Sequence, residues 1–101
     1  MILIVSQRIK IKSSRVPYSI QKKYGEQSII PRIGDKLEDT VWKDPYEYEV
    51  TEIVLNYQDR TCYVEVAPLE GEIPEEKMEE FAEMVKTHGW STSWGQFEHG
   101  Q

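Results

Sequence analysis

The sequence predicts an α+β fold, a small antiparallel sheet or partly open barrel with one C-terminal helix packed on it. Residues 48–67 alternate apolar and polar side chains around a short polar turn, which is typical of a β-hairpin. Residues 74–88 place apolar side chains at helical spacing. The chain has 101 residues, of which 39% are hydrophobic, enough for one core. We therefore expect a single domain, 1–101, with a β-rich body (1–68), a helix (74–88) and an aromatic-containing tail (89–101).

The first segment, residues 2–12, ends in a strict alternation. Arg8, Lys10 and Lys12 fall on one face and Ile9 and Ile11 on the other, which predicts a half-buried strand with a basic open face. Lysine on the open side of a strand also protects a sheet edge from pairing with another chain. We prefer that interpretation to nucleic-acid binding.

The next segment carries few signals. A short strand over 18–21 and a turn at Tyr24-Gly25-Glu26 are the elements it predicts. Residues 30–37 read IPRIGDKL and are followed by Tyr48-Glu49-Val50 and the long hairpin. This pattern, over about 30–67, resembles small uncharacterised proteins of phages and Gram-positive bacteria. The resemblance implies an SH3-like or similar small β-barrel and brings no catalytic residues with it. Independently of it, Gly34-Asp35 predicts a tight turn that is followed by a strand over 36–42.

The hairpin itself predicts a register and a core face. Placing the turn at 58–61 puts the apolar residues of both strands on one face. Cys62 is the only cysteine, and its position on that face favours a core residue over a nucleophile. A single thiol suits a reducing compartment. The predicted cross-strand pairs are Tyr57 with Cys62, Leu55 with Val64, and Ile53 with Val66.

Three aromatic residues, Trp42, Tyr46 and Tyr48, flank the turn predicted at Asp44-Pro45. Such residues can bind peptides or stack on bases. More often they close the open end of a small core, and we prefer that interpretation.

The helix predicted over 74–88 has two distinct faces. Pro74 suits the first helical position, no capping side chain precedes it, and Gly89 is a plausible end. The apolar stripe consists of Met78, Phe81, Ala82 and Val85. The other face carries an acidic stripe of Glu76, Glu79, Glu80 and Glu83, in which like charges lie four residues apart and destabilise the helix slightly. This acidic stripe is either a solvated face or a surface with a cationic neighbour.

The tail is polar but contains Trp90, Trp94 and Phe97. Large aromatic side chains are rare in solvated tails. We prefer a tail that packs back on the domain, with a linear motif for a partner protein as the alternative.

The net charge is −6, but its distribution is uneven. Residues 1–36 hold eight Lys/Arg against two acidic residues, and residues 37–101 hold four against sixteen. This division indicates a nucleic-acid surface, an acidic interaction surface, or two halves that screen each other within the fold.

The sequence lacks a phosphate-binding loop, a zinc-ligand spacing and a nucleophile elbow. We therefore expect no enzyme activity, no cofactor and no metal, and a soluble cytoplasmic protein. The leading hypothesis is a protein-binding module, with an origin in a phage or prophage suggested by the resemblance. The alternative is a nucleic-acid-binding barrel that uses the basic first third. The protein-binding candidates are Glu76, Glu79, Glu80, Glu83, Trp90 and Trp94, and the nucleic-acid candidates are Arg8, Lys10, Lys12, Arg15 and Trp42.

Overall fold

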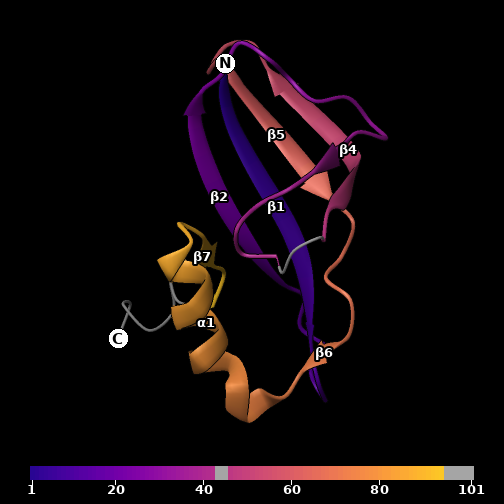
Figure 1. Ribbon diagram of the computed structural model, residues 1–101, viewed down its shortest axis with the longest axis vertical. Helices are drawn as coiled ribbons and strands as arrows, with labels where there is room; N and C mark the ends of the chain where they lie inside the picture. Colours follow the sequence, from indigo (N-terminus) through magenta and orange to yellow (C-terminus); the bar gives the residue numbers. More distant parts are fainter. Residues whose placement is uncertain (43–45, 95–101) are drawn as a thin grey trace.

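The structure is a computed structural model that describes residues 1–42 and 46–94. The described residues form a curled half-barrel sheet with one short helix near its C-terminal end (Figure 1). The elements are β1 (Ile2–Ile11), β2 (Tyr18–Glu26), β3 (Lys36–Leu37), β4 (Tyr48–Asn56), β5 (Thr61–Val66), β6 (Glu72–Ile73), a 3₁₀ turn (Glu75–Lys77), α1 (Met78–Thr87) and β7 (Ser91–Thr92).

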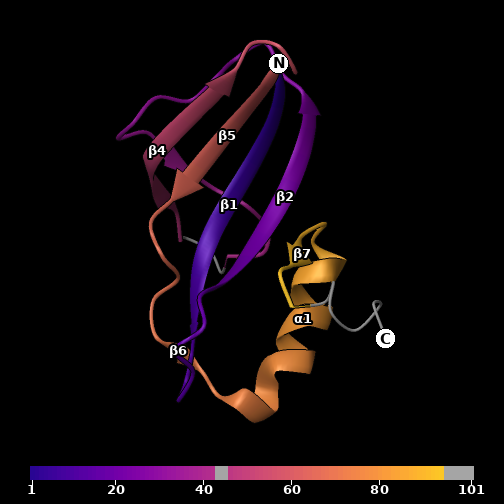
Figure 2. The ribbon, with the colours of Figure 1, turned by 180° about the vertical axis from the view of Figure 1, so that it is seen from behind.

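Within the described ranges the strand order is β3-β4-β5-β1-β2-β7, and β6 pairs with the far end of β1. The expected α+β class and partly open barrel with one C-terminal helix are confirmed, whereas the other arrangement that we expected, an antiparallel sheet, is wrong because β1 runs parallel to β5 and to β6. The strands β1 and β2 form one antiparallel pair, and β4 and β5 form another. The sheet is therefore mixed, with the first strand of the chain at its centre (Figures 1 and 2).

The central position of β1 changes the meaning of its lysines. The alternation is confirmed, since Ile9 and Ile11 are buried while Arg8 and Lys10 are exposed. The edge-protection interpretation is wrong for Arg8, which pairs with Ser19 of β2 on one side while its carbonyl accepts from the Leu69 N–H on the other. Lys10 pairs with β6 on one side, beyond the ends of the β2 and β5 ladders, so the interpretation stays a prediction there.

The short strand predicted over 18–21 is the start of a longer one, β2. The predicted turn at Tyr24-Gly25-Glu26 is instead a bulge in this strand, where the register with β1 shifts between Leu3 and Ile4. Gly25 has a φ of 81°, which a residue with a side chain rarely adopts. The strand predicted over 36–42 is reduced to the two residues of β3.

The hairpin of β4 and β5 is confirmed, but its predicted register is wrong by two residues. Ile53 lies opposite Val64 and Leu55 opposite Cys62. The turn is therefore 57–60 and not 58–61, with Arg60 at a φ of 56°. A shift of two preserves the faces, because side chains alternate with a period of two.

A bulge between Val50 and Glu52 explains a second difference. The extra residue reverses the alternation, so Val50 is fully buried, although strict alternation places it on the other face. At the far end of the hairpin, Leu55 and Tyr57 are exposed because no element covers the sheet there. Cys62 is completely buried, as predicted, and burial raises the pKa of its thiol.

The helix begins later than predicted, since Pro74 precedes a 3₁₀ turn and α1 starts at Met78. Neither segment has a side-chain N-cap, as expected. Gly89, at a φ of 87°, ends the helix, and the backbone N–H of Trp90 donates to the carbonyl of Val85 at 2.9 Å. This reversal sends the chain back toward β2, with which β7 pairs.

The core lies on the inner face of the half-barrel, between β1, β2, β5, the segment 38–42 and α1. In Figures 1 and 2 that segment crosses one face of β1 and β2, and α1 lies beside β2 with β7. The predicted apolar stripe of the helix packs against this core. The buried apolar residues of the cluster are Val5, Ile9, Ile20, Trp42, Val50, Cys62, Val64, Val66, Val85, Trp90 and Trp94.

Candidate functional site: an aromatic groove beside the acidic helix face

The segment 38–42 is held on the sheet by a buried carboxylate. Asp39, 3% exposed, accepts hydrogen bonds from Lys22 Nζ at 2.8 Å and from the Tyr24 hydroxyl through Oδ2. Its Oδ1 accepts from the Val41 N–H and from Trp90 Nε1, both at 2.9 Å. Burial alone raises the pKa of this carboxyl, but the hydrogen bonds outweigh it and the pKa of Asp39 lies below its usual value. Asp39 thus connects β2, this segment and the residues after α1.

A buried glutamine fixes the neighbouring indole. Gln7, fully buried at the centre of β1, donates to the carbonyl of Ala67 and accepts from Trp42 Nε1, both at 3.0 Å. The Trp42 ring lies 4.9 Å from the Tyr48 ring and 5.6 Å from the Trp90 ring. Because the amide nitrogen of Gln7 is bonded to Ala67, its amide oxygen has a fixed position, and the hydrogen bond to that oxygen fixes the orientation of the Trp42 indole.

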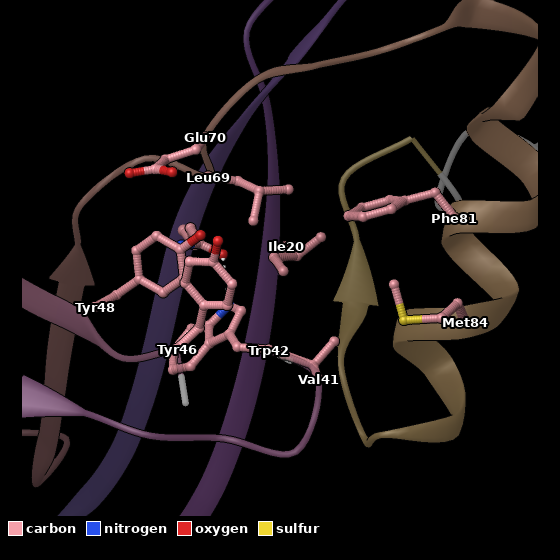
Figure 3. Close-up of a pocket in the computed structure, with 10 residues that line it drawn as sticks. Ile20, Val41, Trp42, Tyr46, Tyr48, Leu69, Glu70, Phe81 and Met84 are labelled. Atoms are coloured by element: carbon pink, nitrogen blue, oxygen red, sulfur yellow. Dashed lines mark hydrogen bonds between the residues drawn. The ribbon is translucent and has the colours of Figure 1, made fainter. Parts of the chain in front are cut away.

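These contacts leave a groove of about 330 Å³ between the sheet and the helix. Figure 3 shows Trp42, Tyr46 and Tyr48 on one side and Phe81 and Met84 of α1 on the other. The other residues that line the groove are Gln7, Ile20, Val41, Leu69 and Glu70. The volume is at the lower end of the range for small-molecule and side-chain sites, and the lining is mostly apolar and aromatic.

The acidic stripe predicted on the helix lies next to this groove. All four of its glutamates are exposed, but only Glu79, Glu80 and Glu83 belong to α1, because Glu76 lies in the 3₁₀ turn that precedes it. Glu80 is four residues before Met84 and therefore shares its side of the helix. One ion pair is made within this stretch, Lys77 with Glu80 at 3.3 Å. Glu70 is the one carboxylate among the described residues that line the groove, on the side opposite the helix, and the exposed glutamates of α1 lie beyond its helix side.

The other two protein-binding candidates are in the core. Trp90 and Trp94 are 2% and 8% exposed. Trp94 packs edge-on against Tyr18 at 5.3 Å and stacks on Phe81 at 6.1 Å. Up to residue 94 the tail therefore packs back on the domain, as preferred, and both indoles support the groove instead of contacting solvent. Phe97 lies outside the described residues.

The nucleic-acid candidates fall on two different faces. Arg8 and Lys10 lie on the outward face of β1, and Lys12 and Arg15 are exposed in the β1–β2 connection. A depression of about 500 Å³ beside Arg8 and Lys10 also contains Glu72, which is opposite Lys10 in the sheet. Trp42 packs on the inner face, 6% exposed, and closes the core as preferred. The structure therefore does not combine these cations with this aromatic ring.

The hypothesis that the basic and acidic halves screen each other finds two examples among the described residues. Lys22 pairs with Asp39 at 2.8 Å, and Lys36 pairs with Glu47 at 3.3 Å. Among the described residues, no ion pair joins the cations of β1 to the glutamates of α1. These two charged surfaces are therefore available to solvent.

Several residues of the site were not identified from the sequence. Gln7 occupies an apolar position in the alternation of β1, and that misplaced polar residue was a usable signal. Asp39 and Glu70 are two acidic residues among eighteen, so nothing in the sequence distinguishes them. Met84 lies outside the predicted apolar stripe yet lines the groove.

Among the residues that the structure describes, no His, Cys, Asp and Glu side chains are grouped as a metal site would require. No helix in these ranges has the length and apolar character needed to cross a membrane. Comparison with protein-family models, with curated proteins and with solved structures found no match. The resemblance over 30–67 therefore stays a prediction, and the function is inferred from the groove.

Proposed function

We propose that this protein is a protein-binding module without catalytic activity, and that its contact surface is the aromatic groove together with the acidic face of α1. The groove is the single observation that carries the proposal. Its walls are held by Gln7 and Asp39, so it exists before any partner binds.

The charge around the groove defines the partner. Exposed glutamates of α1 on one side and Glu70 on the other favour a basic segment and disfavour nucleic acid. A partner would place one side chain in the groove and its positive charges along the helix. Recognition by one buried side chain with a charged rim is a common arrangement in protein interfaces.

The experiment is a selection from a random peptide library against the purified chain. We expect the selected peptides to be enriched in Lys and Arg, and their affinity to fall about tenfold or more when the four glutamates of the acidic stripe are replaced by Lys. A matched control replaces four exposed glutamates elsewhere, namely Glu38, Glu49, Glu52 and Glu72, which gives the same net charge. Met84→Ala should weaken binding by shortening one wall of the groove.

Selected peptides without a charge bias would contradict the proposal, as would equal losses in the stripe variant and its control. The basic outward face of β1 is tested separately, by titrating single-stranded oligonucleotides at low salt. Binding that is lost when Arg8, Lys10 and Lys12 are replaced by Glu would favour the nucleic-acid alternative.

A further inference from the structure

The groove has an uneven distribution of charge and aromatic surface. Its sheet side presents the rings of Trp42, Tyr46 and Tyr48, and Glu70 lies at the end of these rings in Figure 3. Within the described part of the chain, no Lys, Arg or His lines the groove.

Two of these rings pack against each other. The planes of Trp42 and Tyr48 are tilted by 54° with their centres 4.9 Å apart, so they present adjoining surfaces. Tyr46, 54% exposed, extends this side toward solvent. The negative face of an aromatic ring attracts a cation within about 6 Å of its centre, and Trp is the best of the aromatic side chains for this contact.

The charge of Glu70 reaches these rings. The pKa of Tyr48 is raised above its usual value, mainly because the phenol is partly buried. A hydrogen bond with the Glu70 backbone lowers this pKa, whereas the negative charge of the Glu70 carboxylate raises it. A carboxylate that disfavours a phenolate also favours a cation in the same place.

We infer that the groove binds the cationic end of a Lys or Arg side chain of the partner, with the ammonium or guanidinium between the aromatic rings and Glu70. The aliphatic stem lies along Ile20, Phe81 and Met84, as long basic side chains commonly do on apolar surfaces. This inference rests on the proposed function and specifies which chemical group enters the groove.

The test compares two small probes of equal length, hexylammonium and 1-hexanol, by NMR titration of the intact chain. The indole N–H of Trp42 reports on the groove. We expect hexylammonium to bind roughly fivefold more tightly than hexanol, a ratio that corresponds to a cation–π contact at a partly solvated site. The ratio should fall as salt is added.

Two variants assign the effect. Glu70→Gln and Tyr46→Leu should each bring the two affinities together, because the first removes the charge and the second replaces a ring by an apolar side chain. Glu72→Gln, which removes an exposed charge two residues away, should leave the ratio unchanged. Because Tyr46 and Glu70 are exposed, neither variant is expected to disturb folding.

Equal affinity for the two probes would overturn the inference, and so would shifts confined to the exposed face of α1. Neither result would decide the proposed function, which fails only if the selected peptides lack a charge bias or ignore the stripe variant. Hexylammonium preference at Trp42 without any peptide binding would support the cation site and contradict the protein-binding role.

Discussion

Replacing Asp39 by Asn tests the contact that holds the groove together. Asp39 accepts two hydrogen bonds at each carboxylate oxygen. The amide nitrogen of Asn cannot accept, so at least one buried donor loses its partner whichever way the amide turns: Lys22 in one orientation, or the Val41 N–H and the Trp90 indole N–H in the other. Leaving a buried donor unsatisfied costs about 1–3 kcal/mol, and breaking a buried ion pair costs about 3–5 kcal/mol. We therefore expect the free energy of unfolding to fall by about 3–5 kcal/mol.

The assay is urea unfolding followed by tryptophan fluorescence, since Trp42 and Trp90 are both buried next to this contact. A loss of 3 kcal/mol would lower the melting temperature by about 12 °C or more in a domain of this size. Glu38→Gln is the control, because it removes the neighbouring exposed charge and should change stability by no more than about 0.5 kcal/mol. A loss below about 1 kcal/mol for Asp39→Asn would refute this account of the contact.

The same contact predicts a dependence on pH. The pKa of Asp39 is lower in the folded chain than in the unfolded one, so its contribution to stability is complete above the unfolded value of about 3.9. That contribution is lost as the pH falls through the folded pKa, where the carboxyl takes up a proton. The stability difference between the wild-type chain and Asp39→Asn should therefore be largest near neutral pH and shrink in acid.

Three further predictions concern the core. Gln7→Leu leaves the indole N–H of Trp42 and the carbonyl of Ala67 without their partner. We expect the free energy of unfolding, measured with urea, to fall by about 2–4 kcal/mol, and a smaller fall would contradict the role given to the amide. Val85→Ala, at a fully buried position, should cost about 2 kcal/mol in the same assay, whereas Val54→Ala, 50% exposed, should cost no more than about 0.5. The Cys62 thiol should react with a disulfide reagent only after denaturant is added, and rapid reaction in the folded chain would show that the strand opens locally.

Local patterns predicted most of the elements correctly. The alternation of Ile9 and Ile11 with basic residues identified β1, and Gly89 marked the end of the helix. These signals depend only on neighbours in sequence, which a strand or a helix places on one face regardless of the rest of the fold. The two bulges were not predicted, because a one-residue insertion in a ladder depends on what the partner strand offers.

The candidate site was predicted only in part. The acidic stripe was found because helical spacing places its glutamates on one face, and the aromatic residues around 42–48 were recognised as a group. Their partners across the groove, Phe81 and Met84, lie more than thirty residues further along the chain. No local pattern indicates which acidic residue will lie beside them, and Glu70 does so because the connection after β5 passes the same end of the sheet.

The sequence by itself therefore determined the inward and outward faces of β1, the apolar face of the helix, the burial of Cys62 and the exposure of the acidic glutamates, but not the face of Val50, which a bulge reverses. The tertiary structure decided that β1 is central and parallel to β5, and that Trp90 and Trp94 are core residues. It also decided that three aromatic rings and one carboxylate enclose a groove. The physical reason is that periodicity fixes the direction of a side chain relative to its own backbone, whereas a site requires several backbones to meet, and that depends on the packing of the whole chain.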